Sequence, residues 1–218
     1  GPRPNVMYYG DAVAVGADPS YATLAAGHPA AGASGANPWP WSTIGDGSSR
    51  STSIALGDLD NDGDLDIVVG NHGGFPSRAF TNTGGKGVRA PLIGNSGVPL
   101  PGSAGLSTMD VAIAYPDDIN QDGYADIVLA VDGGPNVIYY GGPNPPGDFS
   151  AVASTMIGDP LVAPGNNTVD TSQSVTLVDV DGDGDADAVF GNADGTATTY
   201  YNDGGSLTLT PKPHASPP

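Results

Sequence analysis

The sequence contains no cysteine and no glutamate, and it is poor in basic residues. All 24 acidic residues are aspartate, against six lysines and arginines together, so the formal net charge is −18. Without cysteine the chain can form neither disulfides nor thiolate zinc sites. The shortage of glutamate, lysine and arginine argues against a helical protein, because these residues are the usual solvent-facing helix formers.

The charge and the apolar pattern also restrict the partners of the chain. No basic stripe is present to displace phosphate counterions, so nucleic acid is not an expected partner. No apolar run approaches the roughly 20 residues that span a bilayer, and we expect no membrane insertion. A strongly negative chain attracts cations instead. The sequence starts at Gly1 without an initiator methionine, which we interpret as a mature or trimmed product.

A repeated unit gives the chain its order. With 34 glycines and 21 prolines the composition would be typical of disorder if no periodicity were present. The unit occurs three times, as SIALGDLDNDGDLDIVVGN (53–71), VAIAYPDDINQDGYADIVLAV (111–131) and SVTLVDVDGDGDADAVFGN (174–192). The leading aspartates of the three acidic turns, Asp58, Asp118 and Asp179, are 60 and 61 residues apart. This regularity indicates a repeat protein.

Each unit predicts four short antiparallel strands. An apolar segment, an aspartate-rich turn and a β-branched segment form the first pair of strands. Third strands are predicted within 77–85, 136–142 and 196–205, and the last of these contains an Asn-Asp-Gly-Gly hairpin signal. Segment 5–11 (NVMYYGD) matches 136–142 (NVIYYGG) but has no acidic turn before it. We therefore predict an all-β fold of four-stranded, blade-like units of the β-propeller type, with three whole repeats and a half repeat.

We expect these units to form one domain. The half repeat with a proline-rich insertion occupies 1–45, the repeats occupy 46–105, 106–168 and 169–210, and an extended proline-rich tail occupies 211–218. A closed propeller usually needs four to eight blades. The chain is therefore either a piece of a larger propeller or a protomer that forms homo-oligomers or filaments through open sheet edges. Alternatively, the N-terminal strand caps the chain's own sheets and closes a small domain.

The three acidic windows 58–66, 118–126 and 179–187 align without gaps. Side chains that carry oxygen occupy positions 1, 3, 5 and 9, and glycine occupies position 6. Alternate residues of a tight loop can supply the six to eight oxygens that calcium needs when glycine permits the bend, and position 7 would add its backbone carbonyl. Magnesium demands stricter geometry, and the lack of cysteine or clustered histidine disfavours zinc. The alternative is that aspartate and glycine merely build polar turns.

The strand, acidic loop and strand pattern with its DxDxDG core resembles the FG-GAP or VCBS repeats of integrin α-subunit β-propellers and of many secreted microbial and algal proteins. In that family each loop joins adjacent strands of a blade and binds calcium. The resemblance implies three calcium sites, with the ligands Asp58, Asp60, Asp62, Asp64 and Asp66; Asp118, Asn120, Asp122, Tyr124 and Asp126; and Asp179, Asp181, Asp183, Asp185 and Asp187. Of these, Asp64, Tyr124 and Asp185 would bind through backbone carbonyls. We expect the second site to be the weakest, because Asn120 replaces an aspartate and Tyr124 stands at position 7.

These features predict a calcium-binding structural or adhesive module outside the cell or on its surface. Sites of modular extracellular type often bind calcium at about 10⁻⁴ to 10⁻³ M, a concentration that the cytosol does not reach. An enzyme is not expected. The histidines are His28, His72 and His214, and the sequence shows no nucleophile-serine motif, phosphate-binding glycine loop or metal-spaced histidine pair.

A glycan-binding lectin is the alternative function. Trp39 and Trp41 are the candidate sugar platform, although packing of these tryptophans within the fold is the simpler interpretation. The tyrosine pairs at 8–9, 139–140 and 200–201 recur at equivalent positions, so they predict packing between blades. Asn166 begins an Asn-Asn-Thr glycosylation sequon. Glycans and cell-surface proteins are accordingly the external partners that we consider.

Overall fold

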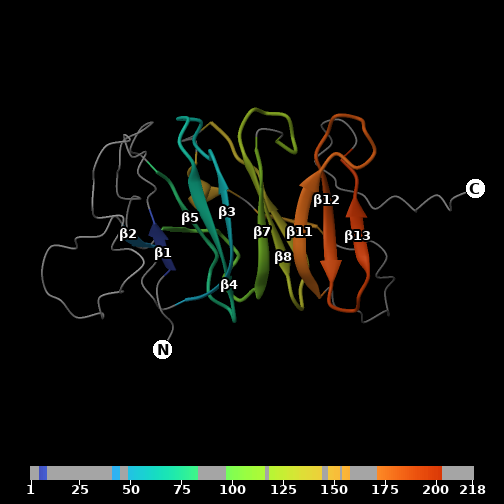
Figure 1. The fold of residues 1–218 in the computed structure, drawn as a ribbon, viewed down its shortest axis with the longest axis horizontal. Helices are drawn as coiled ribbons and strands as arrows, with labels where there is room; N and C mark the ends of the chain where they lie inside the picture. Colours follow the sequence, from blue (N-terminus) through green and yellow to red (C-terminus); the bar gives the residue numbers. More distant parts are fainter. Residues whose placement is uncertain are drawn as a thin grey trace, which may run out of the picture.

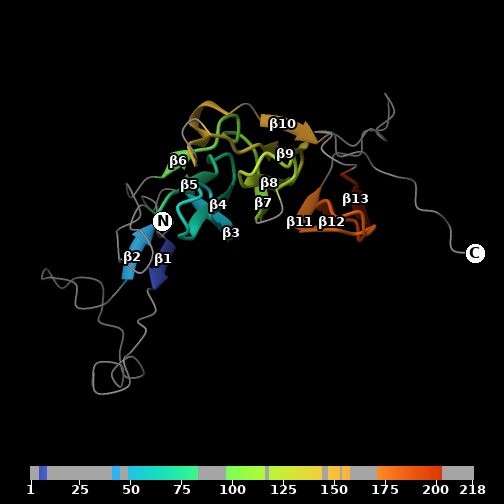
Figure 2. The same cartoon turned by 90° about the horizontal axis from the view of Figure 1, so that it is seen from above.

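The computed structural model describes residues 5–8, 41–44, 49–82, 97–115, 118–143, 147–152, 154–157 and 171–202. Within these residues the regular structure is β-strand, apart from a short 3₁₀ turn, η2 (Phe149–Ala151). The strands form four antiparallel sheets, which confirms the prediction of an all-β fold. The sheets stand side by side in chain order (Figures 1 and 2).

Two sheets are complete four-stranded blades. Blade 1 contains β3 (Arg50–Gly57), β4 (Asp66–His72), β5 (Arg78–Phe80) and β6 (Val98–Pro99). Blade 2 contains β7 (Thr108–Ala114), β8 (Asp126–Val131), β9 (Asn136–Tyr139) and β10 (Ser154–Ile157). Blade 3 has three described strands, β11 (Ser172–Val178), β12 (Asp187–Asn192) and β13 (Ala197–Tyr200). The predicted tail, 211–218, lies outside the described residues.

The three blades share one register. In each, the first and second strands pair up to the last aspartate of the acidic window, through Gly57↔Asp66, Ala114↔Asp126 and Val178↔Asp187. Each first strand also carries a register shift near its start, between Ser51 and Ser53, Thr108 and Asp110, or Ser172 and Ser174. Because the ladders are equivalent, corresponding residues of the three repeats face the same way.

The core lies between neighbouring blades. Val68 and Ala79 of blade 1 share one cluster with Val111, Ile127 and Leu129 of blade 2. The other face of blade 2 packs against blade 3, in a cluster that includes Val128, Ile138, Val175 and Phe190. Tyr139 is buried in the first cluster and Tyr200 in the second, which confirms the predicted packing role for these two tyrosines. Each blade therefore depends on its neighbour to bury a face.

Small residues and one carboxylate hold the blades close together. A Cβ added at Gly57 would lie 2.6 Å from Ile113 Cγ2, so this contact between blades 1 and 2 requires glycine. Asp110 of β7 accepts hydrogen bonds from Ser53 Oγ of blade 1 at 2.5 Å and from Val175 N of blade 3 at 3.0 Å. A single side chain thus connects all three blades.

The N-terminal strand pairs within the chain. β1 (Asn5–Tyr8) and β2 (Trp41–Ile44) form a two-stranded antiparallel sheet. Ile44 is buried against Ile67, Val69 and Phe80 of blade 1. The strand predicted at the N-terminus therefore pairs with β2 along one edge. Its other edge has no strand partner within the described part of the chain.

Candidate metal sites

The three acidic loops lie at the same end of their blades. Each connects the first strand of its blade to the second, and all three stand in a row along the upper edge in Figure 1. The row follows directly from the common register, because equivalent hairpins in stacked blades turn at the same edge. The predicted windows 58–66, 118–126 and 179–187 are thus surface turns between buried strands.

The position-1 carboxylate organises each turn. Asp58 accepts hydrogen bonds from the backbone N–H groups of Asp62 at 3.1 Å and Gly63 at 3.0 Å. The corresponding bonds to Asp118 come from Asp122 and Gly123. Asp179 also accepts from the position-6 glycine, Gly184, but its second donor is Gly182, at position 4 instead of position 5. The position-6 glycines Gly63, Gly123 and Gly184 have φ of 90°, 87° and 98°, values that side chains with a Cβ rarely adopt. Glycine therefore permits the bend, as the sequence indicates.

The position-9 carboxylate is buried and tied to two other elements. Asp66 accepts hydrogen bonds from Leu59 N at 2.7 Å and from Asn82 N, two residues beyond β5, at 2.6 Å. The equivalent donors are Ile119 and Gly141 to Asp126, and Val180 and Asn202 to Asp187, each at 2.8 Å. Sequence reasoning missed the donors after the third strand. Their signal is their place within the glycine-rich segments 82–85, 141–142 and 202–205, which recur in all three repeats.

Burial perturbs the acidity of these carboxyl groups. It raises the pKa of Asp66 to about 6 and that of Asp126 to about 7, and the backbone N–H donors oppose the shift without cancelling it. Neighbouring loop aspartates raise both pKa values further. The pKa of Asp60 is also raised, first by burial and then by the charge of Asp62. The hydrogen bonds that the protein supplies therefore do not fully offset the free-energy cost of keeping these carboxylates charged.

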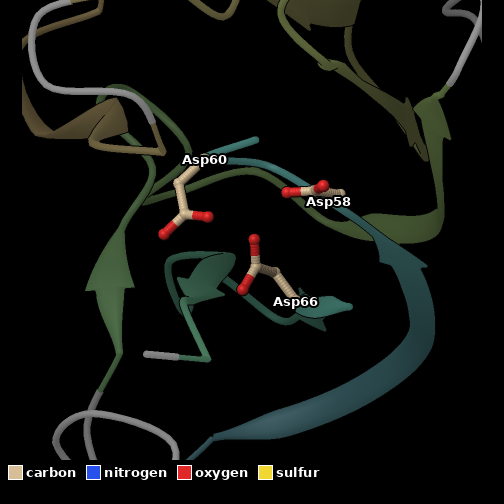
Figure 3. A group of neighbouring side chains, drawn as sticks. All are labelled: Asp58, Asp60 and Asp66. Atoms are coloured by element: carbon tan, nitrogen blue, oxygen red, sulfur yellow. The ribbon is translucent and has the colours of Figure 1, made fainter. Parts of the chain in front are cut away.

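Two loops bring three carboxylates together. Asp58, Asp60 and Asp66 each offer an oxygen within 4.8 Å of the others (Figure 3), and Asp179, Asp181 and Asp187 do the same. Two oxygens bound to one calcium ion are at most about 5 Å apart, since each bond measures 2.3–2.6 Å. These groups could therefore hold a metal ion.

The second loop has the same internal framework with an amide at position 3. Asp122 N lies 3.1 Å from Asp118 Oδ1 and 3.2 Å from Asn120 Oδ1, and the two equivalent distances in the first loop have the same values. An amide oxygen thus stands where the first loop has a carboxylate oxygen.

The predicted ligands at positions 5 and 7 are not part of the carboxylate clusters formed by positions 1, 3 and 9. At position 5, Asp62, Asp122 and Asp183 accept hydrogen bonds from the backbone N–H groups of Asp64, Tyr124 and Asp185 respectively. Neither Asp62 nor Asp183 belongs to the clusters of three carboxylates. At position 7, the side-chain atom Asp64 Oδ2 is buried without a hydrogen-bond partner within the described residues.

The donor set fits a hard divalent cation. The ligands that the side chains offer are carboxylate and amide oxygens, which suit calcium or magnesium. No lysine, arginine or histidine occurs in any of the three windows, so the loops contain no positive charge of their own. A cation would neutralise the buried position-9 carboxylates, and it would give a partner to Asp64 Oδ2, which has none among the described residues.

Other predicted sites fall largely outside the described residues. Trp39 and Asn166 are not among these residues, and Trp41 is described by its backbone alone, as the first residue of β2. The structure therefore leaves the glycan platform and the glycosylation site as predictions. Within the described ranges, no helix has the length and apolarity needed to cross a membrane.

Two family profiles match the chain. The FG-GAP-like repeat matches residues 118–190, which include the second and third loops, and the FG-GAP repeat matches residues 51–87, which include the first. No curated protein matches the sequence. The matched segments cover half of the chain and coincide with the strands and acidic loops described above. The chain therefore belongs to the FG-GAP repeat proteins, and its sheets are β-propeller-like blades.

Proposed function

We propose that this chain is an extracellular calcium-binding module with a structural or adhesive role. The observation that carries the proposal is the convergence of Asp58, Asp60 and Asp66 within 4.8 Å, repeated at equivalent positions in the third loop. The FG-GAP repeat, which is typical of extracellular and surface proteins, supports both the metal and the location. Dissociation constants for calcium of about 10⁻⁴ to 10⁻³ M would suit such an environment.

The role of calcium would be to stabilise the blades. Asp66, at position 9, accepts a hydrogen bond from the backbone beyond the third strand and also belongs to the cluster of three carboxylates, so an ion there would join three strands of one blade. Because unfolding separates the ligands, calcium binding adds to the free energy of unfolding. The loops would thus set blade stability according to calcium concentration.

Calorimetric titration of metal-free protein with calcium tests this proposal. We expect three binding sites, the weakest in the second loop. Replacing Asp179 and Asp183 by alanine should remove one site and leave two. Asp194→Asn is the matched control, because Asp194 is an exposed aspartate in a turn outside the acidic loops. Absence of binding by the unmodified protein at millimolar calcium would contradict the proposal.

We also propose self-association into oligomers or filaments. Ile54 and Leu56 of β3 are 51% and 59% exposed. At the equivalent positions of the next blade, Val111 and Ile113 pack in the core against blade 1. Ile44 of β2 covers part of the same face of blade 1, and the exposed part at β3 is an apolar surface suited to a sheet from a second copy. Within the described part of the chain one edge of β1 has no strand partner, so it offers backbone hydrogen-bonding groups.

Mass photometry in calcium tests self-association. The unmodified chain should form oligomers at micromolar concentration, and Ile54→Ser with Leu56→Ser should shift it towards monomer. Met156→Ser, which alters an exposed apolar residue of β10, is the control. A uniformly monomeric unmodified chain would contradict the proposal. Glycan binding remains a separate prediction, tested by comparing the unmodified chain with Trp41→Ala on a glycan array.

A further inference from the structure

Adjacent acidic loops are joined by amide side chains. Asn61 Nδ2 of the first loop donates a hydrogen bond to the carbonyl oxygen of Gly123 in the second loop, at 2.8 Å. Gln121 Nε2 of the second loop donates to Asp185 Oδ1 of the third. Both donors occupy position 4 of their loop, and both bonds reach position 6 or 7 of the next one. The two interfaces between blades therefore use the same kind of contact.

Position 4 needs a particular backbone conformation but not a side chain. Asn61 and Gln121 have φ of 61° and 58°, in the left-handed region that non-glycine residues seldom occupy. The third loop has Gly182 at this position, with φ of 82°, and it keeps the hydrogen bond from its position-6 amide, Gly184 N, to Asp179. Because glycine builds the turn in the third loop, the turn itself does not require an amide at position 4, and in the first two loops this amide contacts the next loop.

We infer that Asn61 and Gln121 are positioning residues that couple cation binding between successive loops, so that loading one loop raises the calcium affinity of the next. The inference rests on the proposed calcium binding. Position 4 lies between positions 3 and 5, so an ion that orders one loop also orders its position-4 residue. The amide then restrains the neighbouring loop. Because that loop is already partly ordered, it loses less conformational entropy when its own ion binds. Because coupling is reciprocal, the second loop affects the first equally.

Charge acts in the opposite direction. An ion in one loop weakens the negative potential at the next and lowers its attraction for a second ion. This long-range effect is screened over about 8 Å at physiological ionic strength. The hydrogen bond is a direct contact and depends much less on salt. We therefore expect positive coupling on the order of fivefold in calcium affinity at 0.15 M salt.

Each loop contains its own reporter for the test. The backbone amides of Gly63, Gly123 and Gly184 bond to the position-1 carboxylates of the three loops. Two-dimensional amide NMR during a calcium titration thus follows each loop separately. Replacing Asp58 and Asp60 by asparagine disables the first loop. This change should raise the calcium midpoint of Gly123 roughly fivefold in the unmodified background, and it should have little effect in an Asn61→Gly background.

Further variants exclude a general loss of structure. Gln121→Gly should uncouple the second loop from the third while leaving the coupling between the first and second loops intact. Gly182→Asn adds a side chain to the last of the three loops and should not move the midpoints of Gly63 or Gly123. If disabling the first loop shifts the Gly123 midpoint equally with Asn61 or glycine at position 61, the coupling inference is wrong although calcium binding stands. If none of the three glycine amides responds to calcium, the proposed function itself fails.

Discussion

The stability of the metal-free protein should rise as the pH falls from 7.5 to 5, opposite to the behaviour of the calcium-loaded protein. The groups responsible are Asp66 and Asp126, whose pKa values burial raises to about 6 and about 7. The folded state then binds more protons than the unfolded chain, in which aspartate titrates near 4. The free energy of unfolding therefore decreases as pH rises from about 4 to about 7. With calcium bound, protonation instead displaces a ligand, so acidification destabilises the loaded form.

The size of the effect follows from the pKa values. A pKa raised from 3.8 to about 7 corresponds to about 4 kcal/mol for Asp126, and the value for Asp66 corresponds to about 3 kcal/mol. Each kcal/mol shifts the melting temperature of a domain of this size by about 2–4 °C. Between pH 5 and pH 7.5 only part of this free energy titrates, about 4 kcal/mol for the two groups together. A difference of roughly 10 °C between these pH values is therefore expected for metal-free protein.

Thermal melts of protein freed of metal on a chelating resin provide the measurement, because soluble chelators lose affinity in acid. Asp126→Asn serves as the matched variant, since asparagine does not titrate and retains one oxygen acceptor. Without metal at pH 7.5 it should melt higher than the unmodified protein, and with calcium it should melt lower. If the metal-free protein loses stability on acidification from pH 7.5 to 5, the argument from buried carboxyl groups is refuted.

Three other predictions follow from the structure. Removing calcium at pH 7.5 should lower the melting temperature, because an ion at 100 times its dissociation constant adds about 2.7 kcal/mol per site; an unchanged melt after verified metal removal would contradict this. Gly57→Ala should cost about 1–3 kcal/mol in urea unfolding, because its Cβ would meet Ile113, whereas Gly142→Ala has open space and should be neutral. Asp110→Ala should cost about 1–3 kcal/mol by the same measurement, because Val175 N loses its partner; equality with the unmodified protein would show that the bridge between blades is not needed.

The repeat and the acidic loops are features that a single sequence reveals well. The spacing of 60 and 61 residues, the apolar strands and the position-6 glycines depend on local preferences and periodicity, and the structure places strands and bends where they indicate. The third strands were also recognisable, because Asn136–Tyr139 and Ala197–Tyr200 carry alternating β-forming residues. Neighbouring residues decide where strands and bends form, and the repeat spacing can be read from the sequence directly, so no tertiary information was needed.

Contacts between repeats required the tertiary structure. Nothing in the local sequence distinguishes Asn61 and Gln121 from ordinary turn residues, yet folding brings them to loops more than 60 residues away. The same holds for Asp110, which lies outside the three acidic windows and accepts hydrogen bonds from two other blades. The sequence alone thus determined what each blade and loop is made of. How the loops meet was decided by blade stacking, because its geometry depends on the burial of whole sheet faces rather than on any neighbouring residue.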